Sequence, residues 1–324
     1  MTRSMRLIVA AFMALMTAAS SAQAQTWPDR YVRLIVPFAA GGAADVVTRI
    51  VAAKVSENIG QTFIIDNKTG ASGKIGSESV AKSMPDGYTF LVGSPGTMAI
   101  NPNVFSQLPY DVKKDFVEVS HVATFPQILV VNAKTPVNTL KDFLAYVKAR
   151  PKALNYGSSG VGSTGHLITA MFMHEAGLEA GHVPYRGGGP AAQALVAGNV
   201  DFVIDGLPTF QGFITSKLLR ILAITSAQKW PNLPDVPTIG EDAVPGFDLS
   251  SWVVFAAPKG TPKEIVDRLS KEVAKALTSD DVKERLFKVG ALPVGSSPAD
   301  AEKFVRSELA KWKNVVDVTG TKLD

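Results

Sequence analysis

The sequence predicts an α/β fold made of two doubly wound lobes joined by two crossover strands. Short runs of β-branched and aromatic residues alternate along the chain with Ala-rich segments of helical spacing, which is typical of mainly parallel sheets covered by helices. Connectors rich in Pro and Gly, at 101–110 and 230–247, lie near the one-third and two-thirds points of the chain. We therefore expect one lobe from the two ends of the chain and a second lobe from its middle.

The length of the chain agrees with this division. Its 324 residues are too many for one ordinary core and suit two domains of about 150 residues each. With 46% hydrophobic and 19% charged residues, the chain can bury substantial cores. We expect lobe 1 to comprise 25–122 plus 250–324, and lobe 2 to comprise 123–249. Extended segments near 120–128 and 248–256 would then cross between the lobes, which suits a hinge.

Individual elements follow from local patterns. Strands are expected where apolar, β-branched runs end in turn residues, at 33–37, 63–65, 88–93, 127–131, 154–156, 201–205 and 219–225. Helices are expected from helical apolar spacing at 43–58, 74–83, 139–149, 165–176, 190–198, 262–278 and 298–316. Thr261 and Ser297 should cap the last two helices, because each precedes a Pro suited to the first helical turn. Pro excludes regular helix from the two connectors.

The first 24 residues have the pattern of a secretory signal. A basic start with Arg3 and Arg6 precedes an apolar stretch and the small residues Ala22-Gln23-Ala24, which predicts cleavage after Ala24. The alternative, a membrane anchor, needs about 20 apolar residues, and the stretch here is shorter. A protein that works outside the cytoplasm meets no ATP or NAD pool, so nucleotide chemistry is not expected.

Charge and cysteine content exclude further classes of function. The 33 basic and 29 acidic residues are nearly balanced, and no basic block suggests nucleic-acid binding. The chain has no Cys, which excludes disulfides and thiolate metal sites. The chain also has only four His residues. We therefore expect neither a metal centre nor a cofactor.

The first candidate binding loop precedes a predicted helix. It contains Phe38, Ala40, Gly41, Gly42 and Asp45. The glycines let the backbone approach a ligand, and the helix start offers unpaired N–H groups and the positive end of its dipole. This combination favours an anion site. The alternative is a purely structural Gly-rich turn with Asp45 favouring the helix dipole.

A second loop, in the middle of the chain, is rich in hydroxyl groups. Residues 160–165 match G-x-G-x-x-G, with Glu179 about 20 residues beyond, so a dinucleotide site is one alternative. The crowded hydroxyls, and the lack of a strand ending beside Glu179, favour instead a neutral cradle for a carboxylate. Its residues are Ser158, Ser159, Gly162, Ser163, Thr164 and His166. His166 alone is typical of a capping or packing histidine.

Three further loops end predicted strands. One carries Tyr185, Arg186 and Gly187, another carries Asp205, and a third carries Ser94 and Thr97. Arg186 suits a distal carboxylate or a solvated surface, and Asp205 can accept from an amine, a hydroxyl or backbone N–H groups. Because ligands in open α/β sheets bind beyond the carboxyl ends of strands, we expect all five loops to meet there.

Motifs of catalysis are missing from the sequence: no G-x-S-x-G, no P-loop and no zincin helix occur. Binding without turnover is therefore the favoured mechanism. The alternatives are a ligand-sensing subunit of a signalling receptor and a secreted enzyme that uses His166 or Asp205 as a base.

Several segments resemble one family in order along the chain. They are 36–45, 85–89, 99–102, 154–159, 182–185 and 257–262, and together they look like the Bug family of extracytoplasmic solute-binding proteins of tripartite tricarboxylate transporters. The resemblance implies a type II periplasmic binding protein fold in the periplasm. It also implies a monomer that binds a small organic carboxylate and delivers it to a membrane permease.

The resemblance also distributes the site residues over the ligand. It places Phe38, Ala40, Gly41, Gly42 and Asp45 on one side of the carboxylate, and Ser158, Ser159, Gly162, Ser163, Thr164 and His166 on the other. The far end of the ligand would meet Ser94, Thr97, Tyr185, Arg186, Gly187 and Asp205. The chain departs from the family pattern at Gly165 and Gly206, where polar side chains are frequent. Dicarboxylates, amino acids, aromatic acids and hydroxy acids all remain possible ligands.

Overall fold

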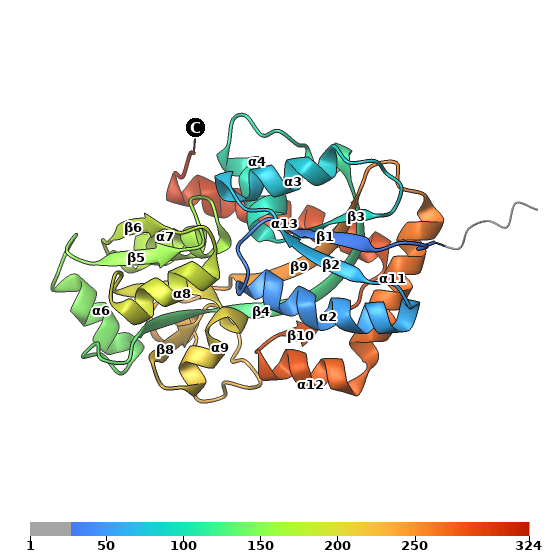
Figure 1. Cartoon of the computed structure of the whole chain (residues 1–324). Helices are drawn as coiled ribbons and strands as arrows, with labels where there is room; N and C mark the ends of the chain where they lie inside the picture. Colours follow the sequence, from blue (N-terminus) through green and yellow to red (C-terminus); the bar gives the residue numbers. More distant parts are fainter. Residues whose placement is uncertain (1–26, 324) are drawn as a thin grey trace, which may run out of the picture.

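One ten-stranded sheet runs through the computed structural model, which describes residues 27–323 (Figure 1). Its main path is β2-β1-β3-β9-β4-β7-β5-β6, and β8 and β10 both pair with β4. The strands are β1 (Val32–Val36), β2 (Phe63–Asn67), β3 (Thr89–Gly93), β4 (Phe116–Asn132), β5 (Asn155–Ser158), β6 (Gly181–Pro184), β7 (Phe202–Gly206), β8 (Leu219–Ile224), β9 (Ser250–Pro258) and β10 (Leu292–Pro293). The expected α/β fold is confirmed.

Helices cover both faces of this sheet (Figure 1). The longer ones are α2 (Ala43–Ile59), α3 (Lys74–Ala81), α6 (Leu140–Lys148), α7 (Thr164–Ala176), α8 (Gly188–Ala197), α9 (Leu207–Thr215), α11 (Lys263–Thr278), α12 (Asp280–Lys288) and α13 (Pro298–Thr319). Single turns form η1 (Ala71–Gly73), η2 (Gly96–Ile100), α4 (Asn101–Val104), α5 (Val112–Asp115) and α10 (Ile239–Asp242). No helix among residues 27–323 is long and apolar enough to cross a membrane. The predicted signal, 1–24, lies outside the described residues.

Strand direction separates the outer strands from those that connect the lobes. The pairs β1–β2, β1–β3, β5–β6 and β5–β7 are parallel, as expected. The strands β4 and β9 are antiparallel to each other and to their other neighbours. The reason is that they carry the chain in opposite directions between the two parts of the molecule.

The long strand β4 belongs to both parts. Its first section, 116–126, pairs with β9, and its second section, 127–132, pairs with β7 and β8 (Figure 1). We call the part with β1, β2, β3, β9 and β10 lobe 1, and the part with β5 to β8 lobe 2. We propose lobe boundaries at 122/123 and 249/250; the change of partner between Pro126 and Gln127 lies four residues beyond the first of them.

Some sequence-based details were wrong for local reasons. Both Pro-rich connectors contain one helical turn, α4 and α10, because Pro is tolerated in a first turn and because Thr238 caps α10. Thr261 does not cap α11: its hydroxyl donates to the Pro258 carbonyl, and Pro262 occupies the cap position. Ser297 does cap α13, accepting from the Asp300 N–H at 3.2 Å.

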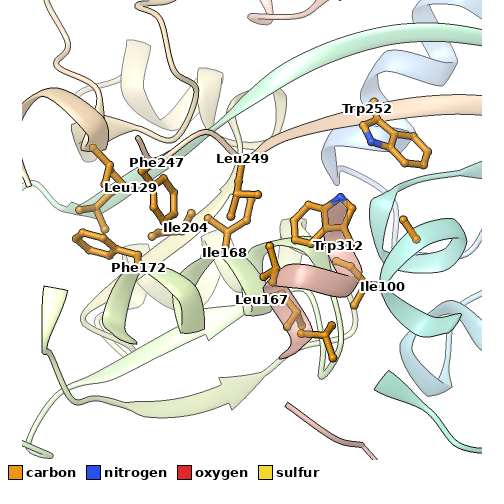
Figure 2. Close-up of a cluster of buried hydrophobic side chains, with 14 of the residues drawn as sticks. Ile100, Leu129, Leu167, Ile168, Phe172, Ile204, Phe247, Leu249, Trp252 and Trp312 are labelled. Atoms are coloured by element: carbon orange, nitrogen blue, oxygen red, sulfur yellow. The ribbon is translucent and has the colours of Figure 1, made fainter. Parts of the chain in front are cut away.

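The C-terminal helix α13 ties the two lobes together behind the cleft. Its Trp312 is fully buried in a cluster with Ile100 of lobe 1 and Leu167 of α7, and Figure 2 shows these side chains close together. The Glu308 carboxylate accepts from the indole N–H of Trp312 at 3.0 Å and from that of Trp252, on β9, at 2.7 Å. One carboxylate on α13 therefore fixes the helix to the returning crossover strand.

Candidate functional site

A cavity of about 40 Å³, lined by both polar and apolar residues, lies between the lobes. All five loops singled out in the sequence reach it, because the carboxyl ends of β1, β3, β5, β6 and β7 point toward the same cleft. The residues that line it are Phe38, Ala39, Gly42, Ala43, Ala44, Asp45, Ser94, Phe125, Gln127, Ser159, Ser163, Thr164, Gly188, Asp205 and Ser251. No Lys or Arg belongs to this lining.

The first loop is held in shape by Asp45. Its carboxylate accepts from the Gly41 N–H at 2.9 Å, pairs with Arg49 at 2.9 Å and accepts from Asn67 at 3.0 Å. Burial by itself would raise the pKa of Asp45, but the hydrogen bonds from Arg49, Gly41 and Asn67 outweigh burial and hold this pKa below its ordinary value. The charge of Asp45 is therefore offset by Arg49, and its carboxylate stabilises the loop without strongly repelling an anion.

Helix starts from both lobes face the cavity. Gly42 precedes α2 and has no side-chain cap, while Ser163 precedes α7 and accepts from the His166 N–H at 3.3 Å. The third helix to begin here is α8, at Gly188. Their unpaired N–H groups and dipoles favour negative charge in the cavity.

Hydroxyl groups supplement these amides. Within residues 27–323, the side chains of Ser94, Thr164 and Ser251 form no hydrogen bond with the protein, yet all three line the cavity. Ser94 and Ser251 belong to lobe 1 and Thr164 to lobe 2. The cavity thus offers neutral donors from opposite walls, which suits a carboxylate held without an ion pair.

A ring stack lies behind the hydroxyl-rich loop. The imidazole of His182 stacks on that of His166 at 4.1 Å and on the Tyr156 ring at 4.8 Å. The Ser158 hydroxyl bonds to His182 Nε2 at 2.6 Å, and His166 Nδ1 accepts from the Gly162 N–H at 3.1 Å. Ser158, Gly162 and His166 therefore shape the loop from behind and are not brought to the cavity lining.

We expect the pH dependence of stability to report this stack. Burial lowers the pKa of His166 to about 4, and burial together with the neighbouring His166 lowers that of His182 to about 3. An unfolded His has a pKa of about 6.5, so the contribution of these residues to stability is complete above that pH and is lost as the pH falls toward 4 and below. In urea titrations at pH 7, 6, 5 and 4, His182→Gln should show a smaller loss than the wild type; an equal loss would contradict this assignment.

Asp205 is a buried carboxylate of the cavity with one unpaired oxygen. Oδ1 accepts from the Gly206 N–H at 2.7 Å, while the buried Oδ2 has no hydrogen-bond partner among the described residues. Burial raises the pKa of Asp205, although the Gly206 N–H and the Ser159 hydroxyl act in the opposite direction. No cationic side chain neutralises it, in contrast to Asp45.

Several predicted residues lie at the rim or outside the cavity. Ala40 and Gly41 are exposed at the rim of the first loop, and the Arg186 side chain is exposed as well. Thr97 lies beneath Ser94 and bonds to its backbone, and Tyr185 is not among the lining residues. The Arg186 main chain has a different role: its carbonyl accepts from the Ala39 N–H at 3.2 Å across the cleft.

Gly187 permits this contact between the lobes. Its φ is +153°, and a Cβ there would lie 2.9 Å from the Ala39 nitrogen. The lobes are therefore closed on each other in this structure, with α8 of lobe 2 directly against the first loop of lobe 1.

The two departures from the family pattern have steric reasons. A Cβ at Gly165 would collide with the Ile204 carbonyl oxygen, because α7 packs tightly on β7. A Cβ at Gly206 would lie 2.5 Å from that of Ala43, which belongs to the opposite lobe. Both glycines allow closer packing than a polar side chain would permit.

Sequence reasoning missed lining residues from the crossover strands. Gln127 and Phe125 come from β4, and Ser251 comes from β9. A signal was present, since Gln127 is a polar residue at the start of the apolar run 127–131. Among residues 27–323, no group of three or more His, Asp or Glu side chains is arranged to hold a metal ion.

The sequence was compared with known families and solved structures. The model of the tripartite tricarboxylate transporter family receptor, TctC, matches residues 47–321. The chain belongs to this family.

Solved structures agree with the TctC assignment. Rpa4515 of R. palustris, solved with adipate, is 43% identical, with 92% of this chain and 100% of that chain covered and a TM-score of 0.89. MatC (Rpa3494) of Rhodopseudomonas palustris, with bound malate, is 34% identical, with 90% and 100% covered and a TM-score of 0.85. The periplasmic binding protein BugD is 31% identical, with 91% and 99% covered and a TM-score of 0.88. The resemblance to the Bug family is confirmed, and TctC proteins are solute-binding receptors of transporters, not enzymes.

Proposed function

We propose that this TctC receptor binds a small organic carboxylate in the cavity between its lobes and delivers it to a membrane permease of the tripartite tricarboxylate type. The observation that carries the proposal is the cavity itself, where helix starts and uncommitted hydroxyls from both lobes converge without a Lys or Arg. The adipate and malate bound by the R. palustris relatives support a carboxylate as the ligand class.

Binding and closure are coupled in this proposal. A carboxylate that contacts both α2 and α7 binds only when the lobes are together, so its affinity favours the closed form. The Ala39–Arg186 backbone hydrogen bond forms in that form alone. The permease would distinguish loaded from empty receptor by the relative position of the lobes. We further propose that the protein is a monomer in the periplasm, released by cleavage after Ala24, and that it uses neither cofactor nor nucleic acid.

The carboxylate site is tested by removing one hydroxyl from each wall. Ser94→Ala combined with Thr164→Ala should weaken binding at least a hundredfold, because each of the two lost hydrogen bonds to a charged group contributes about 1.5–3 kcal/mol. Isothermal titration calorimetry with adipate and malate measures the change. Ser307→Ala, which removes an exposed hydroxyl on α13, serves as the control. Wild-type affinity in the double variant would refute the assigned site.

Two further measurements address the class of function. Mass spectrometry of the small molecules released from denatured purified protein should recover an unmodified carboxylate. Deleting the permease should abolish uptake of that compound; uptake that survives the deletion would favour the sensor alternative.

A further inference from the structure

Two buried polar groups in the cavity lack partners. Gln127 is 1% exposed, and its Oε1 forms no hydrogen bond with the described residues. Asp205 is 7% exposed, and its Oδ2 is equally unpaired. Both residues line the same cavity. Their strands are neighbours, with Gln127 opposite Gly206 and Ile128 opposite Asp205, so the two side chains leave the sheet on opposite faces and reach the cavity from two sides.

Such groups are uncommon in folded proteins, where nearly all buried polar atoms have a partner. The Asp45 carboxylate, which lines the same cavity, follows that rule, since it is bound by Arg49, Asn67 and Gly41. The free hydroxyls of Ser94, Thr164 and Ser251 are assigned above to the carboxylate of the ligand, which leaves Gln127 and Asp205 without a role. The two unpaired groups therefore stand out as positions where a ligand atom completes the hydrogen bonding.

The chemistry of these atoms defines what they can bind. Burial raises the pKa of Asp205, and a donor placed at Oδ2 would stabilise its ionised form, which is only an acceptor. The Gln amide presents an acceptor oxygen beside its NH₂ group. The lining contains no cation that would offset the charge of Asp205. A second carboxylate placed here would meet a like charge in a buried position, whereas a hydroxyl or ammonium group would donate to the free oxygens.

We propose that Gln127 and Asp205 form a subsite for a hydrogen-bond donor on the ligand, so that the protein selects hydroxy or amino carboxylates over plain diacids. This inference rests on the proposed carboxylate function. The helix starts and free hydroxyls bind the carboxylate. The Gln127–Asp205 subsite accepts hydrogen bonds from a hydroxyl or ammonium group on the carbon chain of the ligand.

Matched acids test the subsite by calorimetry. Succinate, malate and aspartate share one four-carbon diacid skeleton and differ only in carrying hydrogen, hydroxyl or ammonium. Glutarate, 2-hydroxyglutarate and glutamate repeat the comparison with one more carbon. In at least one series the wild type should bind a donor-bearing acid at least tenfold more tightly than the plain diacid. The hydroxyl and ammonium arms show which donor is preferred.

Two conservative variants assign that preference to the residues. Gln127→Met keeps the side-chain length without the amide and should reduce the preference at least threefold. Asp205→Asn keeps an oxygen for the Gly206 N–H but removes the charge. It should strengthen binding of the plain diacid and weaken binding of the amino acid. Asp235→Asn, at an exposed position, should change neither affinity.

The outcomes separate this inference from the proposed function. If succinate, glutarate or adipate binds as tightly as the donor-bearing acids, or if both variants weaken all acids equally, the subsite is refuted and the carboxylate function stands. If none of these acids binds the folded wild type, the inference is refuted together with that function.

Discussion

Gly187→Ala should weaken ligand binding at least a hundredfold while the protein remains folded. The added Cβ would lie 2.9 Å from the Ala39 backbone nitrogen, and the φ of +153° is one that side chains rarely adopt. Both problems arise where α8 meets the first loop, so opening the lobes relieves the collision. A hundredfold loss corresponds to about 2.7 kcal/mol. This is a small cost for a clash with the Ala39 backbone nitrogen, because a backbone atom cannot rotate away as a side chain can.

Gly198→Ala is the matched control for this experiment. Gly198 ends the same helix with a φ of +80°, and nothing lies within 4 Å of its added Cβ. This variant should lose about 1 kcal/mol of stability through backbone strain and retain wild-type affinity. Calorimetry with the ligand measures both affinities, and small-angle scattering should show ligand-induced compaction for Gly198→Ala alone. Wild-type affinity in Gly187→Ala would show that closure does not need this contact.

Glu308→Ala should lower the free energy of unfolding by about 2–6 kcal/mol. The substitution leaves two buried indole N–H groups, on Trp252 and Trp312, without their acceptor, and each such loss costs about 1–3 kcal/mol. Urea unfolding followed by tryptophan fluorescence measures the change and reports on the affected rings directly.

Glu308→Gln serves as the control for charge. Both indoles donate to the same oxygen, Oε2, and the Gln amide oxygen can replace it, so this variant should lose less than half as much stability. Glu302→Ala, which breaks only an exposed pair with Arg306, should lose little. Equal losses in all three variants would show that the two indole bonds contribute nothing specific.

The sequence was most informative where periodicity repeats. Alternating apolar runs and helical segments located β1, β3, β7 and most long helices to within a few residues, because each element buries one continuous face. The meeting of the loops followed from the direction of parallel strands. The helices α9 and α12 and the strands β6 and β10 were missed. The helix α12 is mostly charged, α9 contains Pro and Gly, β6 contains Gly and Pro, and β10 has only two residues.

The site itself was less accessible from sequence. Neighbouring positions in a loop differ in the direction of their side chains, so Ser159 lines the cavity while Ser158 bonds to His182 behind it. Gln127 belongs to a strand between the lobes, and nothing local indicates that its amide has no partner. Arg186 was expected at the ligand, but its backbone alone takes part, in a contact that depends on how the lobes meet.

The strand order has a consequence for synthesis on the ribosome. Lobe 2 is built from one continuous stretch of chain, whereas β3 of lobe 1 pairs with β9, from the last quarter of the sequence. Lobe 2, from the middle of the nascent chain, can therefore fold before lobe 1, which contains the N-terminal segment; this reverses the usual N-terminal-first order. A truncated product without β9 would present β3 as a bare, apolar edge open to intermolecular pairing.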